Sequence, residues 1–185
     1  MAASLAGKLL VATPSLVDPN FARTVVLICE HNGEGALGVV LNRPMEHATI
    51  AEHLPEWAPF VSTPRVIFQG GPVEPATALA LGELTGAGAR DGWSRVTGRA
   101  GLLSLSREPA AFADDLERMR VFSGYAGWSQ GQLDGEVEAE AWFIVEPDPG
   151  DLFTSEPGTL WRRVVRRQSS KLAIFAYFPT DPRAN

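Results

Sequence analysis

The sequence predicts a mixed α+β fold in a single domain, from three observations. Apolar and β-branched runs recur along the chain and are interspersed with a few amphipathic stretches. They lack the regular strand–helix alternation of a doubly wound sheet. The 185 residues suffice for one sizeable core, and no internal repeat, low-complexity tract or long linker divides them. We therefore expect residues 1–185 to form one domain.

Strands are predicted wherever short apolar runs end at turn-forming residues. The β-branched runs at 23–30 and 36–42 flank Asn32-Gly33, a dipeptide typical of chain reversals, and so predict a hairpin. Similar runs predict strands at 7–12, 65–73, 76–84, 92–98, 120–122, 141–146 and 172–178.

Helices are predicted where apolar residues recur at helical spacing. Thr49 and Glu52 have the spacing of a capping box, which indicates a short helix at 48–54. Pro109 suits a first helical turn, and the apolar spacing after it predicts a helix at 109–119. A third helix is predicted at 159–168, with Leu160, Trp161, Val164 and Val165 on its apolar stripe.

The glycine-rich stretch at 121–137, VFSGYAGWSQGQLDGEV, admits two interpretations. One is a phosphate-binding loop, but its glycines do not have the spacing of a dinucleotide or P-loop motif, no lysine follows, and acidic residues would repel a phosphate. The other is a strand–turn–helix corner in which the glycines turn the backbone and the helix begins at Ser129 or Gln130. We favour the corner, with Tyr125 and Trp128 as packing anchors whose polar atoms need partners.

Composition narrows the class of protein. The net charge of −6 works against attraction of the whole surface to nucleic acid or anionic lipid. Cys29 is the only cysteine, so no internal disulfide forms, and its apolar surroundings predict a buried, inert thiol. No apolar run reaches the roughly 20 residues of a membrane span, and the N-terminus lacks the pattern of a secretory signal. We expect a soluble, cytoplasmic protein that does not bind membranes.

No catalytic constellation is identifiable in the sequence. His31, His47 and His53 come from different elements and do not have the spacing of metal ligands. No serine stands in a nucleophile-elbow motif between a strand and a helix. We expect no catalytic residues, no metal and no cofactor.

The helix predicted at 159–168 has a basic face opposite its apolar stripe. This face consists of Arg162, Arg163, Arg166 and Arg167. A solvated surface is one interpretation, and contact with nucleic-acid phosphates or an acidic partner protein is the other. The excess of acidic residues elsewhere weakens the nucleic-acid alternative.

Several motifs together resemble the bacterial YqgE/AlgH family over nearly the whole chain. They are the stretch at 7–44 that includes GALGVVLNRP, then QGGPV (69–73), FSGYAGWSQGQLDGEV (122–137), AWFIVEPDPGDLF (141–153), LWRRVVRR (160–167) and the terminal PTDPRAN. The resemblance implies a single α+β domain whose branched, mixed β-sheet curls into a pseudo-barrel flanked by helices. It implies little about activity, because the family's description as a transcriptional regulator derives from an association with alginate regulation. Ser129-Gln130-Gly131 replaces the Gly-Pro-Gly that the family often has, so the turn there can differ.

The polar positions of these motifs are the candidate ligand or partner surface. They are His31, Asn42, Arg43, Gln69, Tyr125, Trp128 and Gln132. If the strand ends at NRP and QGGP meet the GYAGW segment, they would line one cleft whose glycines allow close approach of a ligand. We favour a non-enzymatic binding or regulatory protein with an unidentified protein or small-molecule partner. The alternative is an enzyme of unknown reaction, or a small-ligand-binding protein, that uses the same cleft.

Overall fold

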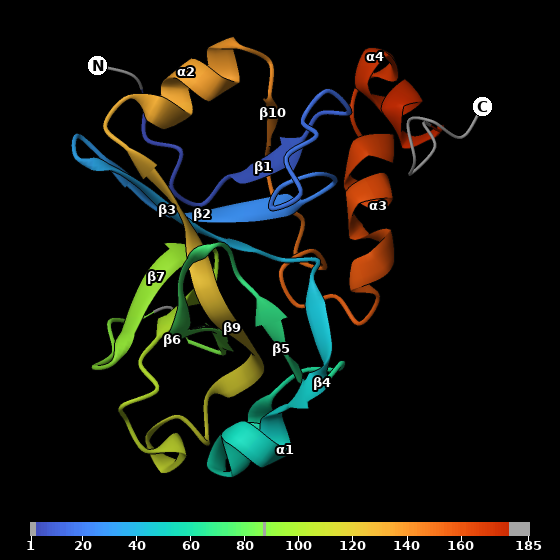
Figure 1. Ribbon diagram of the computed structural model, residues 1–185. Helices are drawn as coiled ribbons and strands as arrows, with labels where there is room; N and C mark the ends of the chain where they lie inside the picture. Colours follow the sequence, from blue (N-terminus) through green and yellow to red (C-terminus); the bar gives the residue numbers. More distant parts are fainter. Residues whose placement is uncertain (1–2, 87, 178–185) are drawn as a thin grey trace.

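Strand β9 (Leu116–Ser129) runs through the whole fold and takes part in both halves of its sheet (Figure 1). Its C-terminal part pairs antiparallel with β3 (Gly35–Val40). Its N-terminal part pairs antiparallel with β6 (Val73–Leu84) on one edge and parallel with β5 (Val66–Gln69) on the other. Because β3 and β5 share one edge of β9, the sheet branches at this strand.

The computed structural model describes residues 3–86 and 88–177. Within them the 10-stranded sheet follows the order β10-β1-β2-β3-β9-β6-β8-β7, with β4 and β5 off this path. The remaining strands are β1 (Leu9–Ala12), β2 (Val25–Asn32), β4 (Pro44–Thr49), β7 (Trp93–Thr97), β8 (Ala100–Leu103) and β10 (Trp142–Val145). The sheet is open, with β10 and β7 at its two ends. The predicted single α+β domain with a mixed, branched sheet is confirmed.

Short helices lie around this sheet. Helix α2 lies over the β1–β10 end of the sheet, α1 lies next to β4 at the opposite end of the molecule, and α3 and α4 stand along one side (Figure 1). The α-helices are α1 (Ile50–His53), α2 (Gln132–Glu138), α3 (Leu160–Arg166) and α4 (Ser170–Ala173), and the 3-10 turns are Pro55–Phe60, Pro109–Ala111, Pro157–Thr159 and Ile174–Tyr177. None of these helices in the described part of the chain is long and apolar enough to cross a membrane.

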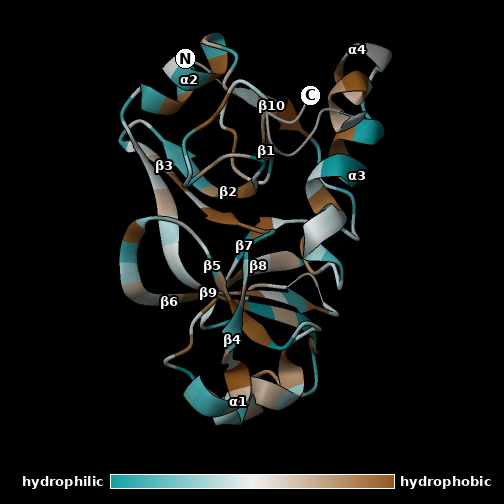
Figure 2. Ribbon diagram, turned by 45° about the vertical axis from the view of Figure 1, so that its right-hand side comes forward, coloured by the Kyte–Doolittle hydropathy of each residue, from teal (hydrophilic) through white to brown (hydrophobic). Residues whose placement is uncertain are grey.

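The core follows the strands, and α3 closes its side. Hydrophobic residues gather on the central strands, whereas α1 and α3 alternate between hydrophilic and hydrophobic positions (Figure 2). Strands β1 and β2 are buried over most of their length, as continuous apolar runs require. The four apolar residues of α3 are all buried, which confirms the predicted stripe. Each such side chain contributes roughly 1.5–3 kcal/mol when fully removed from water.

The predicted hairpin and the short helix near residue 50 are also confirmed. Strands β2 and β3 pair antiparallel across Asn32 and Gly35. Thr49 stands at the N-cap of α1, and its hydroxyl donates to the Glu52 carboxylate at 2.8 Å rather than capping the backbone. The residue types of a capping box therefore mark this helix start, although the side chains bond to each other.

Three expectations about local structure are wrong. The helix predicted at 109–119 is a 3-10 turn at Pro109–Ala111 followed by the start of β9, because pairing with β6 outweighs the helical spacing. The strand predicted at 172–178 is helical through Tyr177, and residue 178 lies outside the described residues. The glycines at 124–127 do not end a strand, since β9 continues to Ser129 before α2 begins at Gln132.

Candidate functional site

The three motifs NRP (42–44), QGGP (69–72) and GYAGW (124–128) lie side by side in the fold. Backbone hydrogen bonds join them or the residues next to them. The Gln69 N–H donates to the Arg43 carbonyl at 2.8 Å, and the Gly70 N–H donates to the Ser123 carbonyl at 2.9 Å. The Gly70 carbonyl in turn accepts from the Val40 N–H at 2.9 Å. The motifs therefore meet where β3, β5 and β9 join, which is the branch point of the sheet.

The glycines at this junction allow one part of the backbone to approach another. A Cβ at Gly70 would lie 2.2 Å from the Gly124 carbonyl oxygen. Gly124 has φ of +70°, and a Cβ there would lie 2.6 Å from the Gly71 carbonyl oxygen. The protein's own backbone therefore occupies the space that the cleft hypothesis gave to a ligand, and these glycines have a structural role.

Asn42 and Arg43 use their side chains to fix the loop before β2. The Asn42 Nδ2 donates to the Arg23 carbonyl at 2.9 Å, and its Oδ1 accepts from the N–H of the first residue of β2 at 3.0 Å. The Arg43 guanidinium donates to the carbonyls of Asn20 at 2.7 Å and Ala22 at 3.2 Å. The polar groups that NRP offered for a cleft thus hold backbone groups of this chain.

Trp128 and Gln132 are joined by a carboxylate that the sequence analysis treated only as a repulsive charge. The Glu136 Oε2 accepts from the indole N–H groups of Trp128 and Trp142, each at 2.9 Å. Gln132 Nε2 donates to the Glu136 Oε1 at 3.0 Å, while its own Oε1 accepts from the Ser129 N–H at 3.0 Å. Glu136 therefore fixes α2 against β9 and β10.

Of the other three candidates, Gln69 and Tyr125 lie at the junction of the motifs, and His31 lies away from it. Gln69 is exposed opposite Ser123, and Tyr125 is half-buried opposite Val73 on β6. His31 accepts from the Leu5 N–H at its Nδ1, at 3.0 Å, near the tip of the β2–β3 hairpin. A hollow of about 470 Å³ beside it is lined by Ser4, His31, Asn32, Gly33, Gln130, Gly131 and Asp134.

The arginines of α3 form a surface of a different kind. Arg162 and Arg166 are exposed, and Arg163 is half-buried. None of the three has an ion pair within the described part of the chain; Arg163 has only a 3.5 Å bond to the Thr159 hydroxyl, and Arg166 lies 5.6 Å from the Tyr177 ring centroid. We call these three residues the cationic face of α3. A hollow of about 480 Å³ runs along this face. It is lined by Glu156, Thr159, the three arginines of the face and Arg167.

Arg167 differs from the other three because it is neutralised within the fold. Its Nη1 donates to the Asp151 carboxylate at 2.8 Å, its Nη2 also pairs with that carboxylate, and its Nε lies 3.3 Å from Asp148. The hydrogen bonds to Asp151 raise the pKa of Arg167, against the effect of burial. Arg167 therefore anchors the 148–151 loop to α3.

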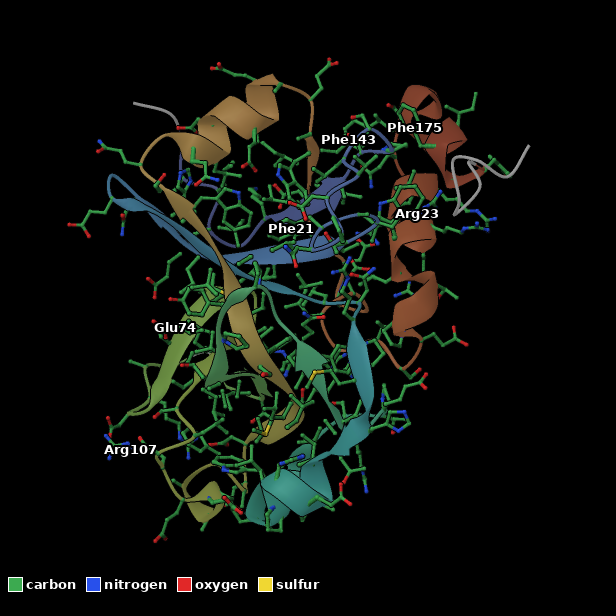
Figure 3. All side chains as sticks on the ribbon, in the orientation of Figure 1. Phe21, Arg23, Glu74, Arg107, Phe143 and Phe175 are labelled. Carbon is green, nitrogen blue, oxygen red and sulfur yellow. The ribbon has the colours of Figure 1, made fainter. Side chains whose placement is uncertain are left out.

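Arg23 lies beside the cationic face, against Trp161, although the sequence analysis did not select it. Its guanidinium carbon lies 4.6 Å from the Trp161 ring centroid, and Figure 3 shows Arg23 against α3. Burial lowers the pKa of Arg23, and the positive charge of Arg162 lowers it further, so the two cations are close enough to repel. No spacing in the sequence connects residue 23 with the helix at 160–166.

A second arginine that sequence reasoning missed lies in the core. Arg120 is fully buried, and donates to the carbonyls of Thr154 at 2.9 Å and Thr63 at 2.8 Å. Its guanidinium carbon lies 4.3 Å from the Phe68 ring centroid, and burial lowers its pKa to about 10. Because both carbonyls come from loops, Arg120 fastens those loops to β9.

Fold and surface together define an α+β protein with a branched, open sheet and a cationic face on one short helix. The model of the AlgH-like family matches residues 9–173, so this chain belongs to that family. The resemblance found in the sequence motifs is thereby confirmed.

Relatives and solved structures agree with this assignment. The chain is 47% identical to a UPF0301 protein of Streptomyces avermitilis, covering 98% of this chain and 96% of that one. A crystal structure of a Corynebacterium diphtheriae protein aligns with a TM-score of 0.89 at 30% identity, over 96% of this chain and 94% of that one. The solution structure of the AlgH protein from Pseudomonas aeruginosa aligns with a TM-score of 0.70 at 29% identity, over 97% and 96%.

Proposed function

We propose that this protein is a non-enzymatic binding protein of the cytoplasm, and that it regulates an acidic partner protein by binding it on the cationic face of α3. One observation carries the proposal: Arg162, Arg163 and Arg166 have no ion pair within the described residues, although the chain has a net charge of −6. Elsewhere arginines such as Arg99, Arg118 and Arg167 are paired with carboxylates.

The base of the cationic face is rigid, which favours recognition of a partner. The Trp161 indole N–H donates to the Ala12 carbonyl at 2.9 Å, and Leu160 and Val164 are fully buried. Arg162 and Arg166 stand four residues apart, where like charges repel weakly on a helix. Carboxylates of a partner would remove this repulsion and accept paired N–H bonds from the guanidinium groups.

A protein partner suits this face better than nucleic acid does. Helix α3 has 7 residues, a length of about 10 Å, which spans few phosphates of a duplex. The surplus of acidic residues in the rest of the chain opposes a long phosphate backbone. A short acidic segment can occupy the hollow along α3, whose lining has four arginines against one acidic residue, Glu156.

The enzyme alternative lacks a comparable supporting observation. Asn42, Arg43, Trp128 and Gln132 are engaged in holding backbone or side chains of this chain. Among the described residues there is no group of three His, Cys, Asp or Glu side chains placed to hold a metal ion. The geometry therefore supports binding on the cationic face of α3 more strongly than catalysis at the junction of the NRP, QGGP and GYAGW motifs.

The proposal is tested by fluorescence anisotropy with a fluorescein-labelled polyglutamate peptide in a salt series. The variant Arg163→Gln/Arg166→Gln is compared with Arg65→Gln/Arg107→Gln, which removes the same charge outside α3 (Figure 3 labels Arg107). We expect the α3 variant to bind about tenfold more weakly than wild type, with binding that weakens as salt rises.

Three outcomes would contradict the proposal. One is an equal loss of affinity in both double variants, which would show that only net charge matters. Another is tighter binding of a labelled DNA duplex than of polyglutamate, which would favour the nucleic-acid alternative. Salt-independent binding of polyglutamate would also exclude recognition by the arginines.

A further inference from the structure

We propose that a hollow beside Glu83 binds a small zwitterion, of the class of α-amino acids with an apolar side chain. The hollow has a volume of about 300 Å³, at the lower end of the range of small-molecule sites. It lies between the β6, β8 and β9 part of the sheet and the loop that follows β10. None of the three arginines of the cationic face lines it, so the inference goes beyond the proposed function and does not depend on it.

Glu83 is a buried carboxylate with one oxygen left for a ligand. It is 7% exposed, and its Oε1 accepts from Arg99 Nη2 at 2.8 Å and from Arg118 Nη2 at 3.0 Å. Its Oε2 has no hydrogen-bond partner in the part of the chain that the structure describes. The only fully buried side-chain nitrogen or oxygen without a partner among the described residues is Arg120 Nε. Oε2 is therefore reached from the hollow that Glu83 lines, where it favours a ligand with a charged donor.

The register of the sheet places two arginines next to this carboxylate. Arg118 stands opposite Glu83 on β9. On β8 the residue opposite Glu83 is Ala100, which follows Arg99 in the chain. A guanidinium has five N–H donors, and Arg118 uses one nitrogen for Glu83 and another for the Pro149 carbonyl at 3.4 Å. Arg118 therefore keeps donors for the carboxylate of a ligand.

The charges that line the hollow balance one another. Asp148 is the second acid of the lining; it is exposed, and its carboxylate lies 3.3 Å from Arg167 Nε. Together with Glu83 it faces the two arginines, Arg99 and Arg118. A ligand with a net charge would bring a charge that this lining does not compensate, whereas a zwitterion matches both signs.

The rest of the lining is mainly apolar. It consists of Ala100, Pro147, Pro149 and Leu152, with Thr97 and Gly98 at its edge. An apolar side chain of the ligand would pack against these residues and leave water. The ammonium group would then bind Glu83 Oε2 and Asp148, and the carboxylate would bind Arg118.

The experiment titrates isotope-labelled protein with L-leucine and follows the backbone amide shifts in NMR spectra. Two matched probes keep the leucine side chain and lack one charge: isocaproate lacks the ammonium group, and isopentylamine lacks the carboxylate. N-acetyl-L-leucinamide has a similar shape without either charge. Glycine, L-valine and L-proline show how much the apolar side chain contributes.

Three variants separate the charge of the site from the charge of the protein. Glu83→Gln keeps an oxygen that can accept from the arginines and replaces the free oxygen by an amide group that repels an ammonium. Asp148→Asn removes the second acid at an exposed position, so this variant tests the site even if Glu83→Gln does not fold. Glu34→Gln, in the exposed turn between β2 and β3, is the matched charge control.

We expect L-leucine to give saturable shifts at Gly98, Ala100 and Leu152, and each probe that lacks a charge to bind about tenfold more weakly. Glu83→Gln should weaken binding of L-leucine about tenfold and Asp148→Asn about threefold, whereas Glu34→Gln should bind as wild type does. Binding of isocaproate, isopentylamine or N-acetyl-L-leucinamide as tight as that of L-leucine would overturn the inference. So would equal affinity of wild type and Asp148→Asn, or the absence of saturable shifts with all four amino acids up to about 10 mM.

Discussion

Single polar residues in the family motifs serve mainly as internal hydrogen-bond partners. Asn42 binds the Arg23 carbonyl and the N–H that begins β2, and Glu136 receives two indole N–H groups and one amide. Each of these two side chains makes the hydrogen bonds that its backbone or indole partners would otherwise have to make with water. A polar residue at a strand end can therefore have a structural role that determines where another residue, such as Arg23, presents its charge.

Cys29 gives a prediction at the same scale. It is 6% exposed, and burial, with a smaller effect of the Glu30 charge, raises the pKa of its thiol from 9.0 to about 12. Between these pH values the folded protein keeps the thiol proton while the unfolded chain loses it. The contribution of Cys29 to the free energy of unfolding is therefore fully present below pH 9.0 and declines above it, by about 1.4 kcal/mol per pH unit.

Urea denaturation of wild type and Cys29→Ala at pH values on both sides of 9.0 measures this effect. The difference in unfolding free energy between the two proteins should be constant below that pH and shrink above it. If the unfolding free energies of the two proteins instead changed in parallel over the whole pH range, the thiol would have the same pKa in the folded and unfolded states. Native wild type should also react with a thiol reagent only as fast as it opens.

At the scale of elements, β9 depends on a glycine that the sequence analysis interpreted as a turn. An alanine at Gly124 would have to adopt φ near +70° and place its Cβ 2.6 Å from the Gly71 carbonyl oxygen. The left-handed conformation alone costs roughly 1–2 kcal/mol. We expect Gly124→Ala to lower the free energy of unfolding by at least about 2 kcal/mol, measured by urea denaturation.

Gly135 is the matched control for that variant. It lies inside α2, and an added Cβ would meet nothing within 4 Å. Gly135→Ala should raise the free energy of unfolding by roughly 0.5–1 kcal/mol, because alanine is the better helix former. Equal effects of the two substitutions would contradict the structural role assigned to Gly124.

Elements were predictable from the sequence where local pattern and tertiary pairing agree. The β2–β3 hairpin and the α3 stripe follow from residue pattern alone, and both are present. The 109–119 segment has helical spacing, but Leu116 and Met119 pair with β6, a partner more than 30 residues away. Strands β4 and β8 were missed, because the apolar character of β4 is interrupted by Glu46 and His47, and β8 begins with alanine and glycine, which have low strand propensity.

The candidate site was predictable to a similar extent. Helical spacing predicts that Arg162, Arg163 and Arg166 lie near one another, and all three line the hollow along α3. It does not reveal that Arg167 is neutralised, because Asp151 comes from a loop before the helix. It also does not reveal Arg23, whose contact with Trp161 depends on how a loop far away in the sequence packs against α3.

For the whole molecule, the path of β9 joins the two halves into one packed unit. The largest hydrophobic cluster contains residues from both halves, with Leu27 and Val39 from one and Phe68 and Leu81 from the other. Helix α3 adds its apolar stripe to the same cluster. Opening one half would therefore expose apolar surface of the other, which favours a single cooperative transition.

The five tryptophans report on every part of this unit. Trp57 and Trp93 belong to the cluster around β6 and β8, Trp128 and Trp142 to the cluster beneath α2, and Trp161 to the shared cluster. If β9 couples the halves, all native indole N–H signals in NMR spectra should disappear at the same urea concentration. Earlier loss of the Trp57 and Trp93 signals than of the Trp128 and Trp142 signals would instead show two units that unfold separately. Gly124→Ala should move all of the midpoints together, since the branch point that it disturbs belongs to both halves.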